Sequence, residues 1–160
     1  MIQPPNNTVI YLMEQGIKTY RKLAQKNLQK VEIDITVDQV LVLMLVANNT
    51  NLTQTQMADI LFKDYASVTR IIELMVKKEL LTRTPYPLDR RRTILNLTKK
   101  GEILLGKILP VVVKNREKAL KGITQEEKVI FKRILTKIIN NCQNQNLDKS
   151  VQKNIKSTAN

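Results

Sequence analysis

Apolar residues recur every three or four positions in six stretches of the chain, a spacing typical of helices with one buried face. Several stretches open with residues that cap a helix N-terminus: Thr-x-x-Gln at Thr36 and Thr53, Thr-x-x-Glu at Thr124, and Asp64. The predicted helices span residues 8–31, 36–47, 53–61, 64–80, 98–114 or beyond, and 124–142. The pattern indicates a mainly α-helical protein.

The 36–47 stretch is apolar on almost every side, which is typical of a helix at the centre of a core. Two β-prone segments, residues 81–84 and 92–97, interrupt the helical pattern. The tip between them, residues 85–91, contains two prolines and is predicted to join neither helix nor sheet. These features predict a β-hairpin with a protruding basic loop directly after the 64–80 helix.

The 53–61 and 64–80 stretches form a two-helix unit joined by a turn at Phe62-Lys63-Asp64. The inward stripe of its second helix is predicted to consist of Val68, Ile71, Ile72, Met75 and Leu80. The opposite side carries donors near its N-terminus that suit base edges and phosphates: Tyr65, Ser67, Thr69 and Arg70. Such a helix end could enter a major groove.

Three motifs in this region resemble the winged-helix signature of the multiple antibiotic resistance regulator (MarR) family. They are Val68-Thr69-Arg70, Asp89-Arg90-Arg91 and Leu97-Thr98-x-x-Gly101. Each motif alone occurs by chance, but order, spacing and chemistry match together. One departure is Glu79, where family members often have the Gly that ends the recognition helix. The resemblance implies a winged helix-turn-helix between dimerisation helices from both chain ends, and a wing arginine, here Arg91, held by the nearby Asp89.

We expect the DNA-binding residues to be Lys63, Tyr65, Ser67, Val68, Thr69, Arg70, Arg90, Arg91 and Arg92, with Asp89 supporting the wing. The ordinary alternative for the wing arginines is a solvated loop that aids solubility. Their position directly after a candidate recognition helix favours insertion into a minor groove. Arg70 could pair with Glu73 along the helix, and that pairing does not exclude DNA contact.

Basic residues outnumber acidic ones 27 to 14, a formal net charge of +13. Residues 1–62 carry five of each sign, residues 63–101 carry ten basic and four acidic, and residues 102–160 carry twelve and five. The first concentration coincides with the two-helix unit and hairpin, as a polyanion-binding surface requires. The longest apolar run, Val40 to Ala47, is far below the ~20 residues that span a bilayer. We expect a cytoplasmic protein with no membrane partner.

The side-chain chemistry excludes several classes of enzyme. The chain has no His and a single Cys142, so Ser-His-Asp and Cys-His arrangements are impossible and a tetrahedral zinc site would be poor. Its four glycines form no phosphate-binding loop. We therefore expect no catalysis, no cofactor and no metal. Cys142 is predicted to be a buried or dimer-facing thiol rather than a peroxide sensor.

The apolar stripes of the first and the last two helices exceed what a small winged-helix core can cover, so we expect a homodimer. The expected organisation is a single domain over residues 1–160. Within it, we expect a winged helix-turn-helix at about 36–100, dimerisation helices at about 8–32 and 99–142, and a disordered tail at about 144–160.

The leading functional hypothesis is a transcriptional regulator that binds specific double-stranded DNA, a ligand-responsive repressor on an inverted-repeat operator. The alternative is a winged-helix module for nonspecific DNA binding or protein docking. An apolar crevice is expected where the 36–47 helix meets the first and fifth helices, with Lys18, Arg21 or Lys22 at its rim. Such a crevice would suit a small amphipathic aromatic acid or phenolic effector.

Overall fold

The computed structural model describes residues 7–31, 33–49, 51–86 and 89–143, and within these ranges it confirms the predicted fold class. In chain order the elements are α1 (Val9–Lys30), α2 (Val37–Asn48), α3 (Gln54–Leu61), α4 (Tyr65–Lys77), β1 (Leu81–Tyr86), β2 (Asp89–Leu97), α5 (Lys99–Ala119) and α6 (Gln125–Gln143). The chain divides into two compact units after Ala119, with α1 to α5 in the first and α6 in the second. The predicted disordered tail at 144–160 lies outside the described residues, as do residues 1–6.

The helices begin where the capping patterns predicted. In α2 and α3 the Thr Oγ1 accepts from the backbone N–H three residues on, and the Gln there accepts in return from the Thr N–H. Thr124 and Glu127 make the same reciprocal pair at the start of α6. These bonds satisfy N–H groups that a helix N-terminus otherwise leaves without partners, so each start is set by local sequence.

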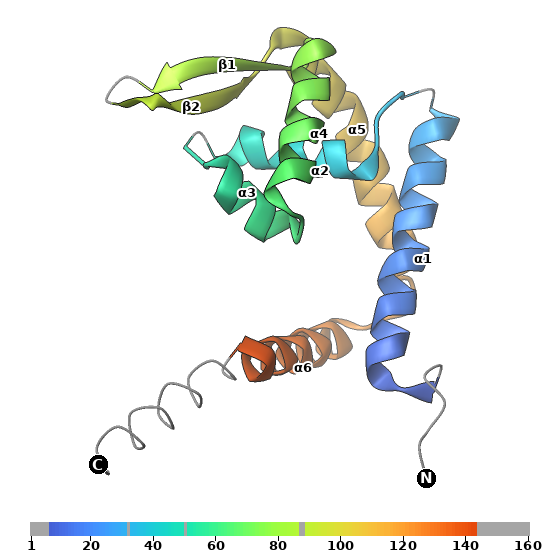
Figure 1. The fold of residues 1–160 in the computed structure, drawn as a ribbon. Helices are drawn as coiled ribbons and strands as arrows, with labels where there is room; N and C mark the ends of the chain where they lie inside the picture. The colour runs from blue at the N-terminus through green and yellow to red at the C-terminus, as the bar shows by residue number, and fades with distance from the viewer. Residues whose placement is uncertain (1–6, 32, 50, 87–88, 144–160) are drawn as a thin grey trace, which may run out of the picture. The chain divides into compact units, whose positions relative to one another are not determined.

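The α2 helix forms the centre of the first unit, as its all-round apolar sequence predicted. Val42 and Leu43 are fully buried there. In Figure 1 α4 crosses in front of α2, α3 lies beside the N-terminal half of α4, and α5 passes behind α2. The core is completed by Ile72 and Met75 of α4 and by Ile108 of α5, all without significant exposure. The buried side chains of α2 thus hold α3, α4 and α5 on one scaffold.

Polar bonds attach the C-terminal half of α1 to this core. Gln25 donates to the Ile35 carbonyl at 3.1 Å and accepts from the Val37 N–H at 3.0 Å. Asn27 donates to the buried Asn115 of α5 at 2.6 Å. Because a buried amide without a partner costs free energy, these pairs fix how α1 packs on α2 and α5.

The N-terminal half of α1 and all of α6 leave apolar side chains exposed. On α1 they include Val9, Ile10, Leu12 and Ile17. On α6, where no residue is buried, they include Val129, Ile130, Phe131, Ile134 and Ile139. Cys142 is also exposed in α6, and its predicted position at a dimer contact stays a prediction. No helix in the described ranges is long and apolar enough to cross a membrane.

The hairpin is an antiparallel pair whose base is regular and whose outer part is not. Leu81 lies opposite Leu97 and Pro85 opposite Thr93, but beyond Pro85 the register shifts and Tyr86 lies opposite Asp89. The extra residues on β2 make a bulge. They are Arg90, Arg91 and Arg92.

The expectation that residues 85–91 lie outside the sheet is wrong for most of them, since β1 continues to Tyr86 and β2 begins at Asp89. In a two-stranded sheet both strands are edges, so Pro85 can turn its missing N–H outward without losing a ladder bond. Strand pairing therefore extends into a segment that composition alone marked as a loop.

The C-terminus of α4 corrects a second expectation. The helix ends at Lys77, before Leu80, because Glu79 adopts a left-handed backbone with φ of 58°. The Glu79 N–H reaches the Val76 carbonyl and the Leu80 N–H reaches the Met75 carbonyl, each at 2.9 Å, the bonds of a Schellman motif. Leu80 still joins the core, now as the residue that follows the helix end.

The base of the hairpin and the start of α5 meet at this helix end. Thr98 donates its hydroxyl to the Glu79 carbonyl at 2.6 Å and accepts from the Gly101 N–H at 2.9 Å. The Thr98 N–H donates to the Leu80 carbonyl at 3.2 Å. A Cβ atom on Gly101 would lie 2.2 Å from that carbonyl oxygen, so only glycine fits. The Leu-Thr-x-x-Gly motif is thus explained by close backbone packing.

Replacing Gly101 with Ala should lower the free energy of unfolding by about 3 kcal/mol, because the clash is with backbone that cannot rotate away. Gly106→Ala in the same helix is the matched control. A Cβ there meets nothing within 4 Å, so the change should be neutral or stabilise by up to ~1 kcal/mol. Urea denaturation measures both. Equal effects of the two substitutions would contradict this account of Gly101.

Candidate nucleic-acid interface

The predicted helix-turn-helix is formed by α3, a tight turn and α4. Phe62 ends α3 in a left-handed conformation with φ of 51°. Its N–H reaches the Asp59 carbonyl at 3.2 Å, and the Lys63 N–H reaches the Ala58 carbonyl at 3.0 Å. This is a second Schellman motif, and it reverses the chain within three residues. The turn sets the angle at which α4 leaves α3.

Asp64 caps the N-terminus of α4, as predicted. Its carboxylate accepts from the Ser67 N–H at 2.8 Å and from the Ser67 hydroxyl at 2.7 Å. The hydroxyl bond, the backbone bond and the nearby Arg70 charge all lower the pKa of Asp64. The carboxylate is therefore ionised at neutral pH, and Ser67 keeps its oxygen lone pairs free to accept from a base.

A hydrogen bond from Thr69 joins α4 to α3. Its hydroxyl lies 2.9 Å from the Tyr65 carbonyl and 3.1 Å from Oε1 of Gln54, the first residue of α3. The Thr69 proton is thus shared between two acceptors inside the protein. This arrangement assigns Thr69 a positioning role between the two helices, which the sequence did not indicate.

The outward face of α4 carries Tyr65 and Arg70, both exposed. Among the ion pairs of the described residues none joins Arg70 to Glu73, so the guanidinium is available to a partner. Val68 was expected at the DNA surface and is fully buried in the core. That expectation is wrong, because Val68 lies on the inward stripe of the helix.

Lys63 lies in an ion pair that the sequence did not predict. Its Nζ is 2.9 Å from Oδ2 of Asp38, in the first turn of α2, and the other carboxylate oxygen pairs with Arg21 of α1. Burial alone would raise the pKa of Asp38, but hydrogen bonds from Lys63 and Arg21 outweigh it and lower that pKa. One carboxylate therefore ties α1, α2 and the turn before α4 together.

The backbone of Arg90, Arg91 and Arg92 lies in the bulged part of β2. Their side chains and that of Asp89 lie outside the described part of the structure, so the pairing of Arg91 with Asp89 stays a prediction. The hairpin projects from the end of α4 that is opposite the turn (Figure 1). The N-terminal end of α4 and the hairpin therefore lie at different places on the first unit.

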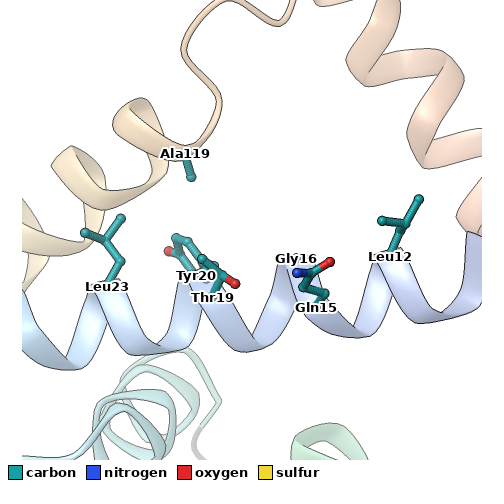
Figure 2. A pocket seen from close by; sticks show the side chains of 7 residues that line it. All are labelled: Leu12, Gln15, Gly16, Thr19, Tyr20, Leu23 and Ala119. Atoms are coloured by element: carbon teal, nitrogen blue, oxygen red, sulfur yellow. The ribbon is translucent and has the colours of Figure 1, made fainter. Parts of the chain in front are cut away.

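Two hollows lie along α1. The larger, about 420 Å³, is lined by Leu12, Gln15, Gly16, Thr19, Tyr20, Leu23 and Ala119. Figure 2 shows the labelled α1 side chains rising from one side of the helix, with Ala119 facing Tyr20 and Leu23. The smaller, about 250 Å³, lies at the α1–α2 junction and is lined by Arg21, Lys22, Gln25, Thr36, Val37 and Asp38.

The expected apolar crevice with a basic rim is therefore divided between two places. The α1–α2 hollow has the cations Arg21 and Lys22 but a mainly polar lining, and Arg21 is paired with Asp38. Lys18 lines neither hollow and pairs with Glu14 at 2.6 Å. The apolar hollow lies further along α1, beside the end of α5, and no cation lines it.

Sequence reasoning missed three residues of this surface. Asp38 and Gln54 contact partners on other elements, and no local pattern signals such pairs. Phe62 had a signal, since a two-helix turn favours glycine at the left-handed position and a bulky residue there is unusual.

In the first unit an amphipathic α4 crosses a buried α2, a tight turn joins α3 to α4, and a hairpin follows α4. These elements define a winged helix-turn-helix fold. The sequence model of the MarR family matches residues 33–92, from the residues before α2 into β2. The transcriptional repressor NicR of Pseudomonas putida is 26% identical over 146 residues, covering 88% of this chain and 92% of NicR.

Two solved structures share the fold. BpsR of Bordetella bronchiseptica, whose DNA binding is regulated by 6-hydroxynicotinic acid, superposes with a TM-score of 0.76 at 20% identity over 86% of this chain and 97% of BpsR. A MarR variant from Escherichia coli in complex with operator DNA superposes with a TM-score of 0.75 at 22% identity over 86% and 99%. The family model and these relatives confirm the resemblance to MarR-family transcriptional regulators found in the motifs of this chain.

Asp38→Asn should lower the free energy of unfolding at pH 7 by about 1–2 kcal/mol, because Arg21 and Lys63 lose their shared anion. The pKa of Asp38 is lower in the folded than in the unfolded chain, so its contribution is present above about pH 3.9 and is lost as pH falls through the folded pKa.

Urea titrations of both proteins between pH 7 and pH 3 measure this difference, which should shrink below about pH 4. Asp34→Asn is the control. Asp34 also pairs with a lysine, Lys78, but its side chain is 98% exposed, so this substitution should change the free energy of unfolding little. A constant difference for Asp38→Asn across the whole range would show that the lost stability is not electrostatic.

Proposed function

We propose that this protein is a sequence-specific repressor that binds an inverted-repeat operator as a homodimer and is released by a small-molecule effector. The observation that carries the proposal is the exposed N-terminal part of α4. Asp64 caps it, Thr69 holds it against α3, and Tyr65 and Arg70 face away from the core. A rigid helix end with free donors is what readout of base edges in a major groove requires.

The proposed DNA contacts divide by role. Tyr65, Ser67 and Arg70 read bases, while Thr69 mainly positions α4. Lys63 reaches a phosphate only by leaving Asp38, so its contribution costs an ion pair. Arg90, Arg91 and Arg92 of the wing supply charge to an adjacent minor groove, with Asp89 orienting Arg91.

The domain organisation follows from the exposed apolar faces. The winged helix-turn-helix at about 36–100 supplies most of the buried core, to which α1 and α5 add Leu28, Leu105 and Ile108, whereas the apolar side chains of α6 and of the N-terminal half of α1 are exposed. Large apolar side chains on several turns of helix mark an interaction surface. A symmetric dimer through the helices at about 8–32 and 99–142 covers them and sets two recognition helices ~34 Å apart.

The effector is proposed to be a small amphipathic aromatic acid or phenol. The apolar hollow beside Tyr20 accommodates a ring, and BpsR provides a precedent for control by an aromatic acid. The ligand must favour the geometry that does not bind DNA. A hundredfold loss of operator affinity requires ~2.7 kcal/mol of differential binding.

Selection of binding sites from a random duplex pool tests the leading proposal against a nonspecific module. A regulator should enrich an inverted repeat and bind it ~10³-fold or more tighter than scrambled duplex. Aromatic carboxylates and phenols are then titrated into the complex. Enrichment of no sequence would favour the nonspecific or docking module, and failure of every ligand at millimolar concentration would exclude this effector class.

Arg70→Ala should weaken binding to the selected operator by about 1–3 kcal/mol and binding to random duplex much less, because a base contact is lost. Lys77→Ala is the matched control, since Lys77 is also exposed but lies at the C-terminal end of α4. Fluorescence anisotropy at fixed salt measures the affinities of the wild type and of both variants for operator and random duplex. Equal losses on operator and random DNA would assign Arg70 to phosphate contact only.

Sedimentation at micromolar concentration should give about twice the 18.4 kDa chain mass. Phe131→Glu should shift the protein toward monomer without loss of helical circular dichroism, because Phe131 is 57% exposed and carries no core packing within the chain. Lys132→Glu adds a negative charge to the neighbouring exposed position and should leave the mass unchanged. A wild-type monomer would exclude the dimeric arrangement.

A further inference from the structure

Phe62 combines two unfavourable features at one position. Its side chain is 94% exposed, the highest value among the large hydrophobic residues of the described chain. Its backbone is left-handed, a conformation that favours glycine because a Cβ atom crowds the following carbonyl. Glycine would serve the turn better on both counts, so the local fold gives no reason for a phenylalanine.

Glu79, just beyond the C-terminal end of α4, has the same backbone conformation as Phe62, but it makes contacts within the chain. Glu79 has the same place in a Schellman motif and a similar φ of 58°. Its carbonyl accepts from Thr98 at 2.6 Å, and its carboxylate lies 3.2 Å from Nζ of Lys100. The ring of Phe62 is almost wholly in water, so packing within the chain does not offset its backbone cost.

We propose that Phe62 is a specificity residue that packs its ring against the 5-methyl group of a thymine in the operator. The inference rests on the proposed DNA-binding function. Phe62 precedes the Asp64 cap of α4 by two residues, and the N-terminal end of a recognition helix is the part that meets base edges.

The charge around Phe62 also favours DNA over a protein as the partner of this ring. Lys63 follows directly, Tyr65 is exposed one turn further on, and residues 63–101 carry ten basic and four acidic residues. A docked protein would have to tolerate that charge, whereas DNA requires it. Among major-groove groups only the thymine methyl is apolar, so it is the one an aromatic ring recognises.

The test begins with the operator selected from a random duplex pool by the full-length protein. Phe62→Gly should raise the urea midpoint, because the left-handed strain is relieved. The same substitution should weaken operator binding by about fourfold or more, the value of one buried methyl group. Phe62→Asn, a second residue that tolerates this backbone, should weaken binding similarly. Stability and affinity thus move in opposite directions.

Glu79→Gly is the matched control. It relieves the same kind of strain at the far end of a 13-residue helix, ~20 Å away, so it should raise stability and leave operator affinity unchanged. The exposed pair with Lys100 that it removes contributes little.

Replacing each operator thymine by uracil removes only the methyl group and locates the contact. The wild-type protein should lose about fourfold in affinity at one position in each half-site, and Phe62→Gly should be insensitive at that position. Such coupling is expected only for a direct contact.

The remaining outcomes overturn the inference in distinguishable ways. Operator binding that Phe62→Gly leaves unchanged would show that Phe62 touches no DNA while the proposed function stands. A weaker variant that keeps the full uracil effect would show that the ring does not contact the methyl group. Selection of no sequence by the wild type would remove the proposed function and the thymine contact together.

Discussion

The structure depends on the close approach of two backbone segments where α4 ends and α5 begins. The Leu80 carbonyl lies so near Gly101 that no side chain fits between them, and Thr98 bonds to the Glu79 carbonyl and to the Gly101 N–H. The end of α4, the base of the hairpin and the start of α5 all meet at this point. Because backbone packing is much stiffer than side-chain packing, their relative directions are set here rather than by the surface residues.

A second polar centre joins the helix-turn-helix to α1. Asp38 holds Arg21 of α1 and Lys63 of the turn before α4, and it remains ionised although it is partly buried. The hollow at the α1–α2 junction is lined by the same Asp38 and Arg21. A change in the packing of α1 would therefore act on a group that contacts the turn before α4 directly.

The proposed recognition surface combines residues that hold α4 in place with residues whose polar groups are exposed. Thr69 and Ser67 use their hydroxyl protons inside the protein, whereas Arg70 and Tyr65 keep their polar groups exposed. If α4 binds DNA as proposed, Ser67 and Thr69 reduce the entropy lost on binding, since they already hold the helix in place. Phe62 extends this surface beyond the helix, at a position where the turn itself would favour glycine.

Local sequence was sufficient for the helix starts, the hairpin and the inward stripe of α4, because caps, turns and hydrophobic spacing act over a few residues. The motif spacing also indicated the family. Local sequence did not show that strand pairing reaches Tyr86 and Asp89, or that Lys63 is held by Asp38. These depend on which distant elements pack together. Two residues 25 positions apart share a contact only after α2 and the turn are placed, and that placement is a property of the folded core.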